Sequence, residues 1–228
     1  MILLIRRKHI SVLMILLLAT VTVLSVAAEK PAAAVIAHDA AGSGETVILD
    51  AGHGGSDGGA VAADGTAEST VTLRMAQIFR DKLLAAGYDV LMIRDGSDVQ
   101  LDNVARTVMA NNKADCHIAL HWDSTKTDKG AFYMSVPNNA AYRAMEPVAS
   151  NWESHNKLGS ALVGGLKQNG VKIFSSGSME MDLTQTSYST IPSIDIELGD
   201  GKSAHDDATL GKLADGLVVG VNSYFGQS

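Results

Sequence analysis

Short runs of β-branched and other apolar residues alternate along this chain with longer stretches of helical periodicity, and this alternation limits the possible folds most strongly. Each run has the length of one strand, and several pass directly into glycine-rich or charged segments, as buried strands do where they enter loops. The runs cover residues 46–51, 89–94, 116–121, 131–136 and 193–198. We therefore expect these five segments to form strands of one sheet.

Amphipathic helices are predicted between the strands. In residues 68–86 the apolar side chains recur at i, i+4, i+7, i+8 and i+12, which is one face of a helix that Gly87 ends. A second helix is predicted to open at Ser97, with Gln100 at capping-box spacing. The face of this helix that is predicted to be buried consists of Leu101, Val104, Ala105 and Val108.

Two further helices complete the alternation. They are predicted to begin near Ser150 and near Asp206, and both carry leucines at helical spacing. Strands that alternate with amphipathic helices predict an α/β fold. We expect a single three-layer domain, with a mostly parallel twisted sheet and helices on both of its faces.

The N-terminal segment differs from the rest of the chain. Three basic residues, Arg6, Arg7 and Lys8, precede an apolar or small run over residues 10–28, which predicts an export signal with a cleavage site in SVAAEK. The run is 19 residues long, so it also has the length of an uncleaved membrane anchor. Residues 29–45 are predicted to be a linker, and residues 46–228 to be one catalytic domain.

Charge and cysteine content exclude several classes of protein. The chain has 18 Lys+Arg against 25 Asp+Glu, a net charge of −7. Removal of residues 1–28 takes away three positive charges and no negative ones, which gives −7 − 3 = −10. An acidic protein of this kind is not expected to bind nucleic acid. The single cysteine, Cys116, excludes an intrachain disulfide framework and any zinc site that needs two thiolates.

Polar residues follow the strands at the points where a ligand would bind. In an open α/β sheet, ligands bind beyond the carboxyl ends of the strands. His53 follows the first strand, His121 ends the third, Glu197 lies near the end of the last, and Glu68 opens the first helix. Two imidazoles and one carboxylate form a ligand set that binds zinc and leaves a position for water. Glu68 and Glu197 are both candidates for the third ligand, and the other one would then carry the proton.

A simpler interpretation stays open at this point. In that interpretation His53 is an ordinary loop residue and His121 is a hydrogen-bonded core histidine. His117 shares a strand face with His121, but four strand residues span about 13 Å, too far for one metal, so His117 is expected in the core. Cys116 is expected to be a small buried residue, and His155 and His205 are expected to face solvent.

Three ordered blocks of sequence resemble a known family. The string TVILDAGHGGSDGGAVAADGTAEST is similar to the opening motif of the zinc-dependent N-acetylmuramoyl-L-alanine amidases of the Amidase_3 family, in which a glutamate follows GHGG's histidine by fifteen residues. MIRDGSDVQLDNVARTVMANNKADCHIALHWDS is similar to the second block of that family, and IPSIDIELGD resembles its last motif, P-x-x-x-x-E-x-G. The likeness extends from about residue 46 to the C-terminus.

This resemblance implies roles for the four candidates. His53, Glu68 and His121 would bind Zn²⁺, and Glu197 would be the catalytic acid/base. The implied reaction is hydrolysis of the amide between the lactyl group of N-acetylmuramic acid and L-alanine in peptidoglycan. A spore-cortex enzyme is a close variant, and the rivals are a non-hydrolytic peptidoglycan-binding module and a zinc peptidase acting on another amide.

The chain departs from the family at three positions. Trp122, Asp195 and Asp200 stand where the family has a small residue, an apolar residue and phenylalanine. Trp122 is expected in the core or the wall of the groove. Arg106 matches an arginine of the family and is expected in an internal ion pair. One of Asp50 and Asp57 is expected to orient the imidazole of His53.

Partners and location follow from the same interpretation. Only about thirty residues separate Val136 from Leu166, so we expect an open groove without a built-in helical lid. We expect an extracytoplasmic monomer that acts on peptidoglycan and meets the membrane only through its N-terminal segment, if that segment is retained. Since the length leaves no room for a wall-binding module, targeting would come from the groove itself or from an activating or targeting protein.

Overall fold

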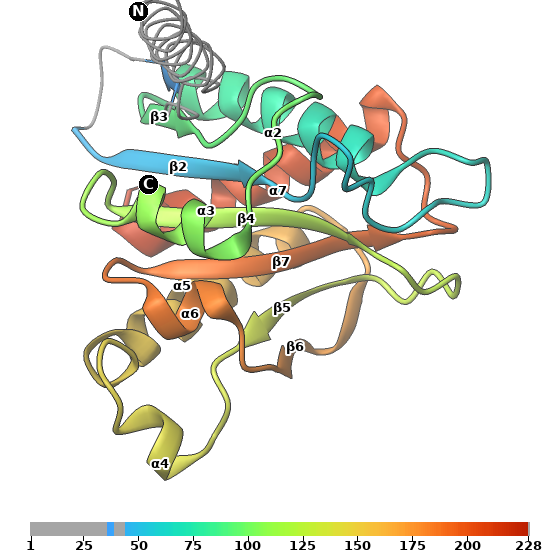
Figure 1. Ribbon diagram of the computed structural model, residues 1–228. Helices are drawn as coiled ribbons and strands as arrows, with labels where there is room; N and C mark the ends of the chain where they lie inside the picture. Colours follow the sequence, from blue (N-terminus) through green and yellow to red (C-terminus); the bar gives the residue numbers. More distant parts are fainter. Residues whose placement is uncertain (1–35, 39–43, 228) are drawn as a thin grey trace, which may run out of the picture. The chain divides into compact units, whose positions relative to one another are not determined.

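A seven-stranded sheet forms the centre of the protein. The computed structural model describes residues 36–38 and 44–227; the predicted leader, residues 1–28, and most of the predicted linker lie outside the described residues. The strand order is β1-β3-β2-β4-β7-β5-β6 (Figure 1). The strands are β1 (Ile36–His38), β2 (Thr46–Ala51), β3 (Asp89–Met92), β4 (Cys116–Asp123), β5 (Ala131–Ser135), β6 (Ile173–Glu180) and β7 (Ser193–Asp200).

The four central strands run in the same direction. β3, β2, β4 and β7 pair in parallel, while β1 pairs with β3 and β5 with β7 in antiparallel fashion, and β6 is parallel to β5. The prediction of a mostly parallel sheet is therefore confirmed. Because parallel strands end at the same edge, the carboxyl ends of β2, β4 and β7 lie next to one another.

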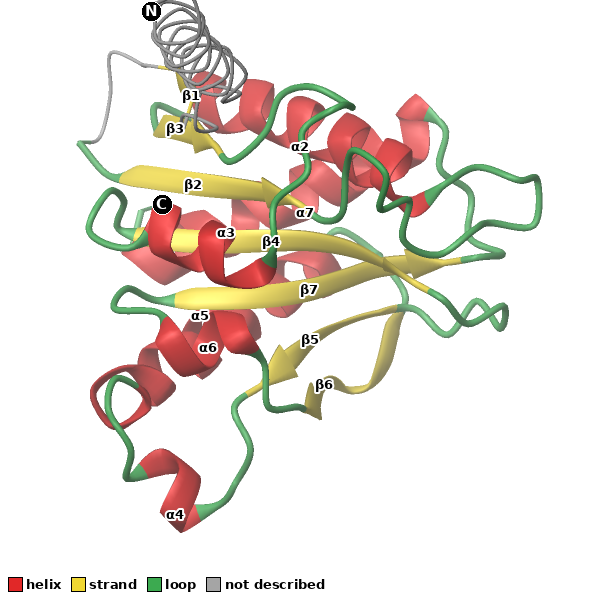
Figure 2. Ribbon diagram, in the orientation of Figure 1, coloured by secondary structure: helices red, strands yellow, loops and turns green. Residues whose placement is uncertain are grey.

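Helices cover both faces of the sheet, which confirms the predicted three-layer α/β fold (Figure 2). The helices are α2 (Glu68–Ala85), α3 (Asn103–Ala110), α4 (Ala140–Arg143), α5 (Val148–Gln168), α6 (Thr184–Tyr188) and α7 (Asp207–Phe225). α2, α5 and α7 pack together on one face, and the short helices α3 and α6 contact each other on the opposite face. Among the described helices, none has both the length and the apolar character needed to cross a membrane.

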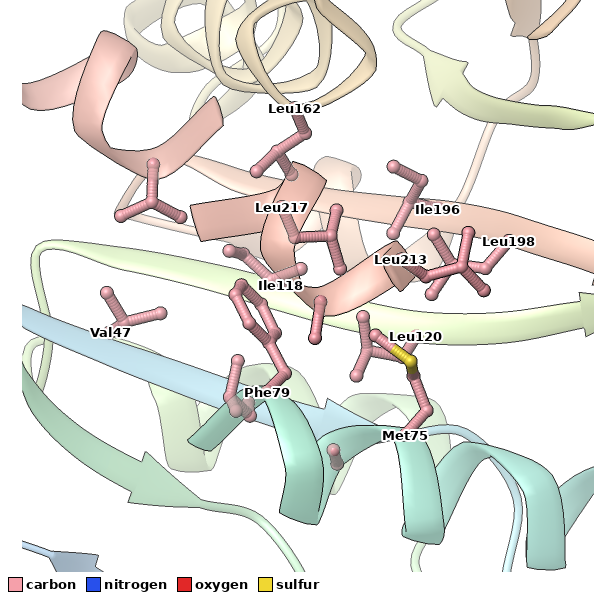
Figure 3. Close-up of a cluster of buried hydrophobic side chains, with 14 of the residues drawn as sticks. Val47, Met75, Phe79, Ile118, Leu120, Leu162, Ile196, Leu198, Leu213 and Leu217 are labelled. Atoms are coloured by element: carbon pink, nitrogen blue, oxygen red, sulfur yellow. The ribbon is translucent and has the colours of Figure 1, made fainter. Parts of the chain in front are cut away.

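The main core lies between the sheet and the long helices. Ile118 and Leu120 of β4 and Ile196 of β7 pack against Phe79 of α2 and Leu217 of α7 (Figure 3). Successive side chains of a strand point to opposite faces. The neighbouring residues of these strands therefore face the thin α3/α6 layer, and this alternation exposes polar strand residues to the site described below.

The second predicted helix is wrong in its start and in its buried face. α3 begins at Asn103, and its N-cap is Asp102, whose side chain accepts a hydrogen bond from the Ala105 N–H at 2.7 Å. Val104 and Val108 are 54% and 60% exposed, whereas Arg106 is buried. The charged and polar contacts of Arg106, rather than the apolar pattern, decide which face turns inward.

Two strands were not predicted. β1 lies inside the expected linker and pairs with β3 over three residues. β6 contains Ser175, Ser176, Gly177 and Ser178, residues that do not form an alternating apolar pattern. Its register against β5 also shifts between Ala131 and Tyr133. Both strands form by backbone pairing with a neighbouring strand of the sheet. The periodicity of apolar side chains does not reveal such pairing, so it did not predict these strands.

Candidate metal centre

The four residues singled out from the sequence come together at the carboxyl ends of the central strands. His53 follows β2, Glu68 is the first residue of α2, and His121 and Glu197 are directly opposite each other in the parallel pairing of β4 and β7. His53 has a φ of 61°. A non-glycine residue in this left-handed region is uncommon, although histidine is among the residue types that are enriched there, and such residues cluster at functional sites.

The carboxylate of Glu68 lies between the two imidazoles. Its Oε2 is 3.2 Å from Nε2 of His53, and its Oε1 is 3.1 Å from Nδ1 of His121. The two rings are nearly perpendicular, at 80°, with centroids 5.2 Å apart. One ligand atom from each residue lies within 4.8 Å of the others, so the three could hold a metal ion. Two imidazole nitrogens and a carboxylate oxygen are a donor set that fits zinc.

Glu68 is held as a carboxylate. It is buried, and it accepts the backbone N–H of Ala60 at 2.8 Å and that of Trp122 at 2.9 Å. Burial raises the pKa of Glu68, but the hydrogen bonds from His121, His53 and these two amides outweigh burial and hold the pKa well below its usual value. Glu68 is therefore ionised at neutral pH, as a metal ligand must be.

Two buried arginines fix the loop that carries His53. Arg94 donates to the carbonyl oxygens of Ala51 at 2.8 Å, Gly52 at 2.9 Å and Ser69 at 2.8 Å. Arg106 forms an ion pair with Asp50 and donates to the carbonyl oxygen of His53 at 2.6 Å. The expectation that Arg106 forms an internal ion pair is thus confirmed.

Asp57, rather than Asp50, contacts the imidazole of His53. The Oδ2 of Asp57 is 2.9 Å from Nδ1 of His53, on the side of the ring away from Glu68. Asp50 instead pairs with Arg106. Although burial raises the pKa of Asp50, the hydrogen bond from His117 and the charge of Arg106 lower it to about 2.

Glycines of the β2–α2 loop let the candidate ligands approach one another. A Cβ atom on Gly52 would lie 2.5 Å from Cε1 of His121. At Gly59, where φ is +66°, a Cβ atom would lie 2.6 Å from both Oε2 of Glu68 and Cδ2 of His53. No side chain at either position is compatible with the observed arrangement of His53, Glu68 and His121.

Gly52→Ala is expected to weaken zinc binding about tenfold or more, because the new methyl group displaces the ring of His121 and overpacking of this kind typically costs about 1–3 kcal/mol. Competition with a chromophoric chelator measures the affinity. Gly58→Ala is the matched control, since the nearest atom to its added Cβ is 3.6 Å away. Equal zinc affinities in the two variants would contradict the close approach of Gly52 to His121.

Glu197 lies beside the cluster in a buried environment. Oε2 of Glu197 and Oδ1 of Asp195, two residues earlier on β7, are buried and have no hydrogen-bond partner among the described residues. Burial, and next the charge of Asp195, raise the pKa of Glu197 to about 8. A carboxyl group that exchanges its proton near neutral pH is suited to acid/base work. Asp195 had no assigned role in the sequence interpretation.

A cavity of about 170 Å³ opens next to the two histidines. It lies between the sheet and the α3/α6 layer, and its lining includes His53, His121, Asp195, Arg106 and Gln185. None of its described lining residues comes from the β5–α5 connection, which contains α4. Tyr142 of α4 instead donates a hydrogen bond to Asp182 at 2.9 Å.

Among the remaining candidates from the sequence, the prediction for His155 is wrong. Cys116, His117 and Trp122 are buried, as expected. His155 is also buried, not solvent-facing, because its face of α5 packs on the start of β7 and its Nδ1 accepts the Ser193 N–H at 2.8 Å. His205 is half-buried, with Nε2 3.2 Å from Asp64.

The buried His155 is expected to make the protein sensitive to acid. Burial, and next the nearby His117, lower the pKa of His155 from 6.5 to about 4. The folded protein then binds fewer protons than the unfolded chain between these pH values, so stability is intact above pH 6.5 and decreases as the pH falls towards 4. The full loss is on the order of 3 kcal/mol.

Urea unfolding of wild type and His155→Gln at several pH values tests this expectation. Glutamine can accept the Ser193 N–H without titrating, so the free energy of unfolding should depend less steeply on pH in this variant, whatever its absolute stability. Asn138→Gln, at an exposed position that carries no titratable group, is the control and should keep the wild-type slope. Identical slopes in wild type and His155→Gln would contradict the assignment.

The comparisons with known proteins identify the family. Residues 47–221 match the family described as Amidase_3: N-acetylmuramoyl-L-alanine amidase. The Bacillus subtilis (strain 168) protein YqiI is 31% identical over 191 residues, which are 81% of this chain and 86% of that protein. The chain therefore belongs to the Amidase_3 family, and it is an enzyme of the N-acetylmuramoyl-L-alanine amidase class.

Relatives that bear this activity in their names match over shorter stretches. The N-acetylmuramoyl-L-alanine amidase AmiA of Escherichia coli (strain K12) is 33% identical over 116 residues, which are 50% of this chain and 40% of AmiA. The chain thus matches less than half the length of AmiA. The CwlD amidase of Clostridioides difficile, solved in complex with the GerS lipoprotein, has the same fold, with a TM-score of 0.66, 21% identity and coverage of 80% of this chain and 98% of CwlD.

Proposed function

We propose that this protein is a zinc-dependent enzyme that hydrolyses the amide between N-acetylmuramic acid and L-alanine in peptidoglycan. The observation that carries the proposal is the close approach of His53, Glu68 and His121, whose ligand atoms lie within 4.8 Å of one another. Glu197 lies opposite His121 on the next strand, and both histidines line the cavity. Zinc supplies Lewis-acid chemistry when bound: it polarises a carbonyl and makes water a better nucleophile at neutral pH.

The protein's own residues would carry the proton and hold the geometry. Glu197 takes a proton from the attacking water and returns it to the departing amine, which becomes the new amino terminus of the stem peptide. Asp57 fixes the ring of His53 through Nδ1, so that Nε2 faces Glu68. Arg94 and Arg106 hold the loop backbone, and the ligands therefore need little rearrangement to bind the metal.

Glu68, rather than Glu197, is favoured as the carboxylate ligand. Glu68 is ionised, since its pKa lies well below the usual value, and it contacts both histidines. A second group, His121, Asp195 and Glu197, could also hold a metal ion. The raised pKa of Glu197 is better suited to proton transfer than to ligation, because a ligand must be deprotonated.

Export and partners are part of the proposal. The apolar run over residues 10–28 supports transport out of the cytoplasm, by a cleaved signal or a retained anchor. The fold shared with CwlD, which was solved in complex with a lipoprotein, supports an activating or targeting partner. A spore-cortex role is a variant of the proposed function. Muropeptide analysis of vegetative walls against cortex distinguishes the two substrates.

Digestion of purified sacculi tests the function. The zinc-loaded protein should release new L-alanine amino termini, measured by labelling and mass spectrometry of the products, and a chelator should stop the release. Binding to sacculi without any new amino terminus would indicate a non-hydrolytic module instead. Amino termini of another residue would indicate a zinc peptidase that cleaves a different amide.

A further inference from the structure

Each imidazole of the metal centre faces carboxylates on two sides. Nε2 of His53 and Nδ1 of His121 face the two oxygens of Glu68. The other nitrogen of His53 lies 2.9 Å from Asp57, and the other nitrogen of His121, Nε2, lies 3.5 Å from Oδ2 of Asp195. The arrangement around the two rings is therefore the same: Glu68 on the inner side and an aspartate on the outer side.

Asp195 has little else to interact with. Its side chain is only 15% exposed, and Oδ1 is buried without a hydrogen-bond partner among the described residues. Among the residues that the structure describes, His121 is the only basic residue whose side chain forms an ion pair with Asp195. A largely buried carboxylate is destabilised unless a partner compensates its loss of hydration, and the interaction of Asp195 with His121 can offset that loss.

We propose that Asp195 is a positioning residue for the metal centre, which accepts the Nε2–H of His121 and thereby leaves Nδ1 as the nitrogen that binds zinc. This inference rests on the proposed zinc function. A carboxylate on the outer nitrogen of a metal-binding histidine fixes its tautomer and ring orientation, and losing one typically lowers metal affinity about 10–100-fold. At 3.5 Å the contact is longer than a well-formed hydrogen bond, and the positive charge that a ring gains on a metal strengthens it.

The position of Asp195 in the fold agrees with this role. Asp195 and Glu197 are two residues apart on β7, so both side chains lie on the sheet face that His121 also occupies. β7 therefore brings the carboxylate of Asp195 to the nitrogen of His121 that does not face Glu68.

A second metal is the alternative use of the same residues. His121, Asp195 and Glu197 offer ligand atoms within 4.8 Å of one another. A metal there would occupy Nε2 of His121 and both carboxylates, so Glu197 would no longer be free to move a proton. The two interpretations differ in zinc stoichiometry, which makes them separable by experiment.

Zinc affinity and stoichiometry of the full chain test the proposal with three variants. Asp195→Leu removes the acceptor and introduces an apolar residue, and Asp195→Asn is nearly isosteric and keeps one acceptor oxygen. Asp98→Asn, at an exposed position, is the control for loss of one negative charge. We expect one zinc per chain throughout, with affinity lowered about 10–100-fold in Asp195→Leu, less in Asp195→Asn, and unchanged in Asp98→Asn.

The protonation of His121 gives a readout that a merely structural role would not change. In the zinc-loaded wild type, ¹⁵N NMR should show Nε2 of His121 protonated, with a proton that exchanges slowly, and this proton should exchange faster in Asp195→Leu.

If a folded Asp195→Leu variant binds zinc with wild-type affinity while the wild type is active, the positioning role of Asp195 is rejected and the proposed function is not. Two zinc ions per wild-type chain, one of them lost in Asp195→Leu, would replace the role with a second metal site. A wild type that takes up no zinc would reject both this inference and the proposed function.

Discussion

Replacing Glu197 with glutamine is expected to lower kcat on peptidoglycan by about 10²–10⁴-fold, because glutamine cannot take up and return the proton that the reaction moves. Zinc affinity should stay close to that of the wild type, since Glu197 is not one of the three proposed ligands. The rate is measured by the release of L-alanine amino termini, and the affinity by competition with a chelator.

The comparison with two other glutamates sharpens this prediction. Glu68→Gln should lose both zinc and activity, because Glu68 contacts both histidines. Glu153→Gln, at an exposed position of α5, is the control and should match the wild type in both measurements. A Glu197→Gln variant that loses zinc along with activity would make Glu197 a ligand, and one that keeps the wild-type rate would remove it from the reaction.

Replacing Arg94 with methionine is expected to destabilise the metal-free protein by about 3–5 kcal/mol, because each buried polar group left without a partner costs about 1–3 kcal/mol. Arg94 is 1% exposed, and its guanidinium group donates hydrogen bonds to the carbonyl oxygens of Ala51, Gly52, Ser69 and Gly96. Methionine fills most of the space but donates no hydrogen bond. Urea denaturation measures the loss in the free energy of unfolding.

Arg74→Met provides the matched control for Arg94. The guanidinium of Arg74 is half-exposed and pairs with Asp207 at 2.6 Å. Exposed ion pairs contribute about 0–1 kcal/mol, so the control should lose little stability. Losses of similar size in the two variants would contradict the view that Arg94 holds the backbone of the β2–α2 loop.

Much of the fold was predictable because the central strands are buried on both faces or alternate regularly. β2, β3, β4, β5 and β7 lie where apolar runs predicted them, within two residues at their ends. The inward face of α3 was not predictable from its own residues, since the apolar Val104 and Val108 are exposed and the charged Arg106 is buried. Its partner, Asp50, lies 56 residues earlier in the chain, and only the folded sheet brings the two together.

In the candidate site, too, some residues could be predicted from the sequence and others could not. His53, His121 and Glu197 were found because parallel strands end at one edge of the sheet, and Glu68 because it opens the helix after the glycine-rich loop. The outer contacts of the histidines were not decided by sequence. Asp57 and Asp50 were equal candidates for His53 until the loop geometry separated them, and Asp195 acquires a partner only through the pairing of β4 with β7.

Anomalous diffraction at the zinc edge, on crystals grown with zinc, tests the metal centre most directly. We expect one peak, bound by Nε2 of His53, Nδ1 of His121 and the carboxylate of Glu68 at about 2.0–2.2 Å. Glu197 should lie beside the metal without ligating it. A folded, zinc-supplemented protein without a peak would rule out zinc binding by His53, Glu68 and His121, and so would a peak held only by His121, Asp195 and Glu197.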